Sequence, residues 1–250
     1  MEEMETQLLL TGVTIGLLSG FFGIGGGTIL VPLLMMMGYD IKSAVGISVM
    51  QMVFSSLYGS WINHKKGFLN LKEGVVTGLG GFVGALGSGW LVSAVPEIVL
   101  ESMFLAVIGF ALFRFFKAPD YSGDESGHDV SPLLLAAAGA VIGLFSISMG
   151  IGGSILLTPI LVGLLRYPLK KAVSAGLFFV VFSSLSGFIS LSLAGHIDYL
   201  HGFLVGAASL LGVYAGIHLA SLTGHRKHKN ALIVLYIIIL GMMLKKVLGV

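Results

Sequence analysis

The chain contains 250 residues, of which 56% are hydrophobic and only 10% are charged, against about 25% charged residues in an average soluble domain. So few charged side chains cannot cover the surface of a soluble domain of this size, and the mean hydropathy of +0.99 indicates that a lipid bilayer is the main solvent. The net charge of +2 is too small to indicate a nucleic-acid partner. The absence of cysteine excludes disulfides, thiolate nucleophiles and cysteine-ligated metals.

The apolar residues fall into about eight stretches, and a membrane-spanning helix needs about 20 such residues. The stretches cover residues 7–38, 43–63, 74–95, 98–116, 132–165, 172–195, 202–223 and 230–244. The long polar interruption at residues 118–131 is acidic, and we interpret it as a solvated cytoplasmic linker rather than a metal site. The predicted fold class is therefore an all-α integral membrane protein.

The chain contains an internal repeat. GLLSGFFGIGGGTILVPLL at residues 16–34 matches GLFSISMGIGGSILLTPIL at residues 143–161 without a gap. After one inserted residue, VFSSLYG at residues 53–59 matches VFSSLSG at residues 181–187. These matches predict a first repeat over residues 1–117 and a second over residues 132–250, with the linker between them.

Two of the apolar stretches are too long to be single spanning helices. Residues 7–38 would extend about 46 Å as one helix, beyond a hydrocarbon core of about 30 Å, and residues 132–165 are similar. Glycine clusters interrupt both stretches, so each is predicted to form a re-entrant helical hairpin. If residues 132–165 enter and leave on the same side, eleven of the fourteen Lys and Arg residues lie on that side, as the positive-inside rule favours.

Each half then consists of one re-entrant hairpin and three transmembrane helices. Three crossings is an odd number, so the two halves are expected to be inverted repeats, which is the plan of many secondary transporters. A duplicated, plain eight-helix bundle is the alternative.

The glycine clusters are the main candidates for function. Glycine accepts positive φ and close approach of a ligand, and a half-helix that begins after each cluster would point free N–H groups into the protein. Pro32 and Pro159 are expected in the first turns of these half-helices. Such helix ends form an anion site without Lys or Arg. The candidate substrate-binding residues are Ser19, Gly23, Gly25, Gly26, Gly27, Thr28, Gln51, Ser55, Ser56, Ser146, Ser148, Gly150, Gly152, Gly153, Ser154, Ser183 and Ser184. The alternative is that these small residues only allow helices to pack closely.

His218 is the candidate for proton coupling, because an ionisable group within a membrane segment is a functional candidate. A neutral, structural histidine is the alternative. The sequence contains no zinc motif, no P-loop and no constellation of catalytic acids or nucleophiles, so we expect no catalytic residues, no metal and no cofactor.

At these residues the sequence resembles the sulfite exporter TauE/SafE family, a group of prokaryotic and plant membrane transporters. The resemblance rests on GFFGIGGGTILVPLL at residues 20–34, its echo GIGGSILLTPIL at residues 150–161, and GHID at residues 195–198. It implies a multi-pass secondary transporter of the cell (inner) membrane that carries a small anion of the sulfite, sulfonate or sulfoacetate type, with protons as the candidate coupling ion. An anion-selective channel and a carrier of non-sulfur organic anions are the alternatives.

Overall fold

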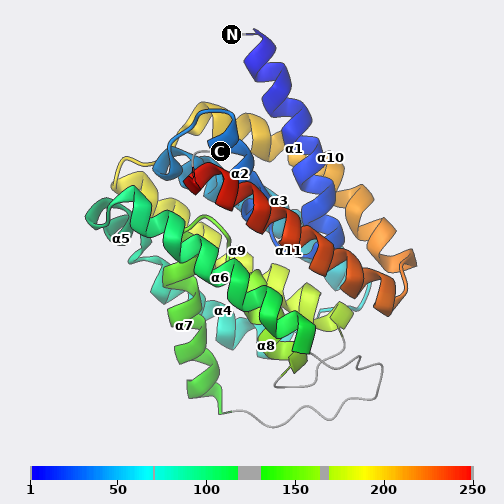
Figure 1. Ribbon diagram of the computed structural model, residues 1–250. Coiled ribbons are helices and arrows are strands. Elements are labelled where there is room, and N and C mark those ends of the chain that lie inside the picture. Colours follow the sequence, from blue (N-terminus) through cyan, green and yellow to red (C-terminus); the bar gives the residue numbers. More distant parts are fainter. Residues whose placement is uncertain (1, 70, 118–130, 164–168, 249–250) are drawn as a thin grey trace.

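The computed structural model describes residues 2–69, 71–117, 131–163 and 169–248, and almost all of the predicted linker lies outside these ranges. Within them, all regular secondary structure is α-helical (Figure 1). The helices are α1 (Glu2–Phe22), α2 (Gly27–Met36), α3 (Ile41–Lys65), α4 (Leu71–Ala85), α5 (Ser88–Ala94), α6 (Glu97–Lys117), α7 (Pro132–Ser148), α8 (Ser154–Gly163), α9 (Leu169–Leu193), α10 (Tyr199–Leu222) and α11 (His225–Leu248).

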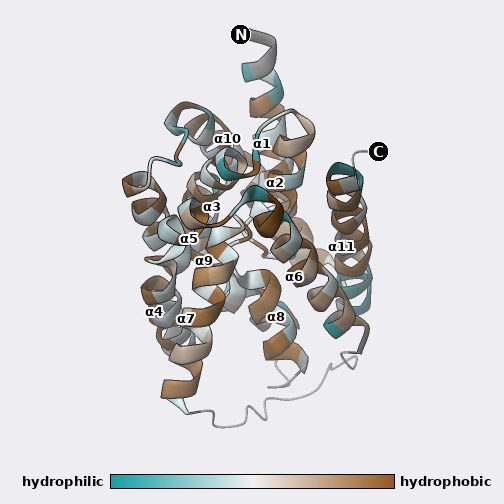
Figure 2. Cartoon of the chain, turned by 60° about the vertical axis from the view of Figure 1, so that its left-hand side comes forward, coloured by the Kyte–Doolittle hydropathy of each residue, from teal (hydrophilic) through white to brown (hydrophobic). Residues whose placement is uncertain are grey.

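The described part of the chain contains six helical segments that are long and apolar enough to cross a membrane. They are Glu5–Phe22, Ile41–Lys65, Gly74–Ala94, Leu169–Leu193, Tyr199–Leu222 and Arg226–Val247. Figure 2 shows this pattern in α11, which is hydrophobic along its middle and hydrophilic at both ends. The prediction of an all-α membrane protein is confirmed, and both overlong apolar stretches are broken into a longer and a shorter helix at their glycine clusters.

The helices of the two halves correspond in order, and their contacts are reciprocal. α1 packs against α10 of the second half, and α7 packs against α4 of the first. In the same way α2 contacts α11, and α8 contacts α6, while α3 and α9 pack against each other. Each hairpin is therefore held by helices of the other half. In Figure 1, α1 begins at the upper end of the molecule, whereas α7 begins at the lower end.

The helix crossings between the halves depend on small residues. A Cβ atom on Gly16 of α1 would collide with the backbone of Ser209 in α10, and one on Gly84 of α4 would collide with the backbone of Ala140 in α7. These glycines allow the close backbone approach that stabilises helix pairs in membranes.

One helix of the first half is broken where its counterpart in the second half is continuous. α4 ends at Ala85 and α5 begins at Ser88, whereas α10 continues through the equivalent region. The break frees backbone groups, and α9 pairs them. Ser190 Oγ donates to the carbonyl of Leu86 (2.6 Å) and accepts from the N–H of Gly89 (2.9 Å). A break in a buried helix is tolerated because side chains replace the lost backbone hydrogen bonds.

Candidate functional site

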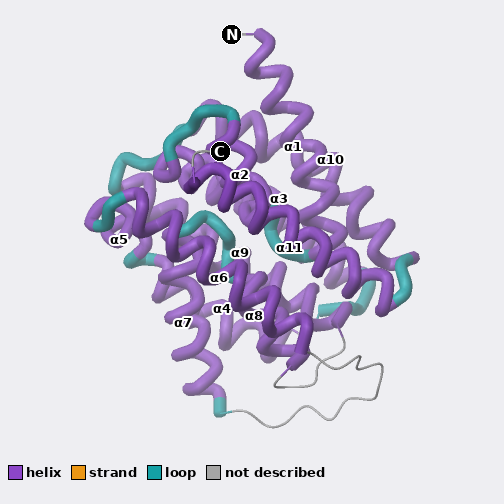
Figure 3. Tube along the Cα trace, in the orientation of Figure 1, coloured by secondary structure: helices purple, strands orange, loops and turns teal. Residues whose placement is uncertain are grey.

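Two short loops carry the glycine clusters, and both are completely buried. Residues 23–26 join α1 to α2, and residues 149–153 join α7 to α8 (Figure 3). Three equivalent pairs of glycines have nearly the same positive φ: 66° and 70° for Gly23 and Gly150, 78° and 74° for Gly25 and Gly152, and 87° for both Gly26 and Gly153. A side chain other than glycine rarely adopts these angles. The repeat seen in the sequence is thus also a repeat of backbone conformation.

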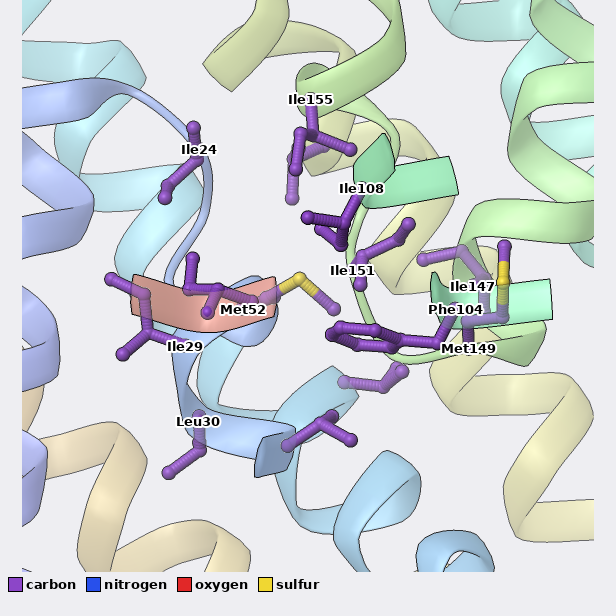
Figure 4. Packing of buried hydrophobic residues seen from close by; sticks show 14 of the residues in the cluster. Ile24, Ile29, Leu30, Met52, Phe104, Ile108, Ile147, Met149, Ile151 and Ile155 are labelled. Atoms are coloured by element: carbon purple, nitrogen blue, oxygen red, sulfur yellow. The ribbon is translucent and has the colours of Figure 1, made fainter. Parts of the chain in front are cut away.

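The two loops lie against each other. The carbonyl oxygen of Gly150 is so close to Gly27 that a Cβ atom there would collide with it. Met52 and Val180, which occupy equivalent positions in the two halves, fill the space between the loops. A Cβ atom on Gly25 would lie 3.5 Å from Met52 Sδ and 3.1 Å from Val180 Cγ1. Figure 4 shows Met52 beside the loops that carry Ile24 and Ile151.

The backbone groups of the loops are unevenly paired. The carbonyl oxygens of Gly25 and Gly152 accept hydrogen bonds from Ser55 Oγ (3.0 Å) and Ser183 Oγ (3.1 Å), and those of Gly26 and Gly153 accept from N–H groups of the following helix. In contrast, no hydrogen-bond acceptor is found among the described residues for the N–H groups of residues 25–28 and 152–155. At the start of each short helix the N–H groups are therefore unpaired, while the two carbonyls directly before it are paired, a polarity suited to an anion.

The helices that follow the loops add to this polarity. α2 begins at Gly27, directly after the loop, and its N-cap residue Gly26 has no side chain to pair the first N–H groups. α8 begins at the equivalent Ser154. The free N–H groups at a helix N-terminus carry a partial positive charge. Pro32 and Pro159 lie in the second turns of these helices rather than in the first turns, because the glycine loops themselves form the helix starts.

The predicted serine ligands divide into two groups. The hydroxyls of Ser55, Ser183 and Ser148 donate to carbonyl oxygens, those of Gly25, Gly152 and Leu144. The remaining side chains are fully buried and have no hydrogen-bond partner among the described residues: Ser19, Thr28, Gln51, Ser56, Ser146, Ser154 and Ser184. Ser56 and Ser184 each follow a serine that faces its loop, so they point about 100° away around the helix.

Gln51 lies directly against the first loop. A Cβ atom on Gly26 would be 2.8 Å from Gln51 Oε1 and 3.0 Å from Nε2. The equivalent position of the second half is Phe179, whose ring packs against Gly153. The first loop thus has a polar neighbour where the second has an aromatic one.

Two residues at the loops were absent from the sequence prediction. Ser48 Oγ donates to the carbonyl oxygen of Gly150 (2.8 Å), and Met52 contacts Gly25 and Gly152. Both could have been found from helical spacing, because Ser48, Met52 and Ser55 recur at i, i+4 and i+7 and therefore share one face of α3.

His218 lies elsewhere. It is exposed near the end of α10, beside Leu17, Tyr214 and Leu219 on the outer surface, and the structure does not bring it to the loops. Its role in proton coupling stays a prediction.

A separate polar cluster lies at the end of α9, where the loop between α9 and α10 meets the loop between α2 and α3. His201 Nδ1 lies 2.7 Å from Asp198 Oδ2 and 3.3 Å from the Tyr39 hydroxyl, and His196 Nε2 lies 2.9 Å from Ser93 Oγ. Burial raises the pKa of Tyr39, and the charge of Asp198 adds to this effect. Burial lowers the pKa of His196, helped by Lys42 and opposed by Asp40.

These features define a multi-pass helical membrane protein in which two short helices start at a buried pair of glycine loops. Residues 8–243 match the family model for the sulfite exporter TauE/SafE family, and the chain belongs to this family of membrane transporters. The resemblance noted in the sequence is confirmed.

Relatives with assigned names agree with this membership. The chain is 28% identical to a probable membrane transporter protein of Methanocaldococcus jannaschii over 78% of this chain and 74% of the relative. It is 24% identical to the probable membrane transporter protein YunE of Bacillus subtilis over 93% of both chains, and 27% identical to YdhB of the same organism over 86% of this chain and 90% of the relative. No solved structure matches the chain.

Proposed function

We propose that the protein is a secondary transporter that carries a small anion across the cell (inner) membrane by alternating access. The cargo is a sulfur-containing anion of the sulfite, sulfonate or sulfoacetate type. One observation carries the proposal: the N–H groups of residues 25–28 and 152–155 have no acceptor among the described residues, while serine hydroxyls pair the carbonyls of Gly25 and Gly152. In this proposal the oxygens of the anion accept hydrogen bonds from these N–H groups.

The electrostatics of the loops support an anion rather than a cation. The side chains nearest to Gly25, Gly26 and Gly27 are all uncharged, and no carboxylate is among them to repel an anion. Oriented N–H groups and helix N-termini then supply the favourable potential. Because these groups are fixed by the fold, they need no reorganisation when the anion arrives.

We further propose that residues 1–117 and 132–250 are inverted repeats, with the linker 118–131 in the cytoplasm. The reciprocal helix contacts and the opposite starting ends of α1 and α7 support this arrangement. In Figure 1, α6 ends and α11 begins toward the lower right of the molecule. The last turn of α6 contains Arg114 and the first turn of α11 contains Arg226, as expected for the cytoplasmic side. Rocking of one repeat against the other would expose the loops to each side in turn.

A small cavity supports an approach to the loops from the basic end. It is lined by Lys170, Asn63, Ser174 and His228 from α9, α3 and α11. Val173 also lines it, and this side chain lies against Gly23 of the first loop. Beyond the cavity, Met52 and Val180 fill the space between the loops, which favours an occluded carrier over an open channel.

The proposal is tested by a flux screen in proteoliposomes. Sulfite, sulfate, thiosulfate, taurine, sulfoacetate and lactate are compared, with and without a proton gradient. We expect saturable transport of at least one of the sulfur anions. Absence of flux for every anion contradicts the proposal. The same assay on His218→Gln tests the proton role, because loss of the gradient effect with retained flux is expected if His218 carries the proton.

A further inference from the structure

We propose that Gln51 determines the substrate, and that the substrate is a monovalent oxyanion which carries one hydrogen-bond donor and binds at the first glycine loop. This inference rests on the proposed function and adds the class of anion and the half of the protein that holds it.

The side chain of Gln51 is completely buried, and neither amide atom has a hydrogen-bond partner among the described residues. Both atoms lie beside Gly26, the N-cap residue of α2. An unpaired buried amide is costly, so a side chain of this kind at the start of a ten-residue helix points to a ligand that pairs it.

The loop and the start of α2 offer unpaired N–H groups and the unpaired hydroxyl of Thr28, and such donors are suited to the oxygens of an oxyanion. Gln51 offers a donor and an acceptor. No donor among the described residues pairs the acceptor Oε1, and a ligand that carries an O–H or N–H group would pair it. An oxyanion with one such group would therefore pair both the donors of the loop and the amide of Gln51.

The surroundings of the first loop limit the charge of the anion. The atoms nearest to a Cβ position on Gly25, Gly26 and Gly27 belong to uncharged residues: Ile15, Ser48, Gln51, Met52, Gly150 and Val180. A helix N-terminus supplies about half a unit of positive charge. Burial of a second negative charge without a cationic side chain is strongly unfavourable, so the site favours a monovalent anion over a divalent one.

The surroundings of Gly26 and Gly153 differ in a way that assigns the anion site to the first half. Ile15 lies at Gly26, and its counterpart Ile142 lies at Gly153, so the two surroundings correspond except for Gln51 and Phe179. The ring of Phe179 cannot donate or accept in place of the amide. The second loop therefore lacks an amide at the position equivalent to Gln51.

The test uses two sulfonates of nearly the same shape, 2-hydroxyethanesulfonate and propane-1-sulfonate, with sulfate as the divalent anion. Binding to the purified protein is measured as ligand-induced thermal stabilisation. We expect 2-hydroxyethanesulfonate to bind at least about fivefold more tightly than propane-1-sulfonate, the effect of one additional hydrogen bond, and sulfate to bind most weakly.

Gln51→Met keeps the unbranched shape of the side chain and removes the amide. In this variant we expect the two sulfonates to bind equally. Phe179→Leu, at the equivalent position of the other half, is the control and should keep the preference. The inference is overturned if the unaltered protein binds the two sulfonates equally, binds sulfate more tightly or fails to bind 2-hydroxyethanesulfonate. It is also overturned if the preference survives Gln51→Met. Transport of some other anion in the flux screen would leave the proposed function standing in each of these cases.

Discussion

The hydroxyl of Ser48 donates a hydrogen bond to the carbonyl oxygen of Gly150, at 2.8 Å. Ser48 belongs to α3 of the first half, and Gly150 is the first positive-φ glycine of the second loop. The bond therefore joins a central helix of one half to the glycine loop of the other. Ser55 makes the corresponding bond within its own half, to Gly25. Together they hold both loops against α3.

We expect Ser48→Ala to destabilise the folded protein. The substitution leaves the buried carbonyl of Gly150 without its hydroxyl donor, which costs about 1–3 kcal/mol. Thermal or denaturant unfolding of the purified protein measures the effect. Ser102→Ala is the matched control, because the Ser102 hydroxyl is exposed and bonds only to its own helix. Equal stability of the two variants would show that the bond between the halves contributes nothing.

Gln51→Met should have the opposite effect on stability. It replaces a fully buried amide that has no partner among the described residues with an apolar side chain of similar shape, so the unfavourable burial of polar atoms disappears. We expect the ligand-free protein to gain roughly 1 kcal/mol, as is common where function requires an unfavourable group. The unfolding temperature without added anion measures this. A lower unfolding temperature would mean that Gln51 stabilises the fold.

Lys170 should attract anions into the cavity at the basic end. This residue lines the cavity, and its ammonium group donates to the carbonyl of Ser221 (3.1 Å), which leaves further donors available. We expect Lys170→Gln to raise KM for anions added on that side, more strongly at low salt, with the maximal rate little changed. Lys66→Gln, an exposed lysine at the same end, is the control. An unchanged KM for Lys170→Gln would exclude this route.

The stability of the protein should fall as the pH is lowered through the range in which His196 titrates. Burial and Lys42 lower the pKa of His196 in the folded state, so the unfolded state binds this proton more readily. The contribution is therefore intact above the unfolded value of about 6.5 and is lost as the pH falls through the lower folded value. Unfolding temperatures between pH 8 and pH 5 measure it. His196→Gln should lessen the decline; an identical decline would assign it to other groups.

Much of the architecture follows from patterns in the sequence. The glycine clusters at residues 23–27 and 150–153 predicted both helix breaks, because positive φ at consecutive glycines is incompatible with a continuous helix. The match between residues 16–34 and 143–161 predicted two halves with the same order of helices. The helix breaks and the order of helices depend on residues close together in the chain, so the sequence alone predicts them.

Features that depend on the packing of one half against the other could not be predicted. The break between α4 and α5 is stabilised by Ser190, about a hundred positions away in the chain. The apolar periodicity of α10 does not reveal that His218 faces outward, because a membrane helix is hydrophobic on its outer side as well. Gln51 and Phe179 align in the repeat, but only the structure shows that each lies against the last glycine before a short helix.

The most direct test of anion binding by the loop backbone is the affinity of Gly25→Ala for the anion that the flux screen identifies. Gly25 has φ of 78°, and a residue with a side chain adopts this conformation at a cost of about 1–2 kcal/mol. We expect the backbone of Gly25→Ala to leave this conformation, so that the N–H groups of the loop turn away from the anion. We predict at least about tenfold weaker binding by a variant that still purifies as a single species. Gly109→Ala, on α6 with nothing within 4 Å of the added Cβ atom, should bind normally. Unchanged affinity of Gly25→Ala would contradict anion binding at this loop.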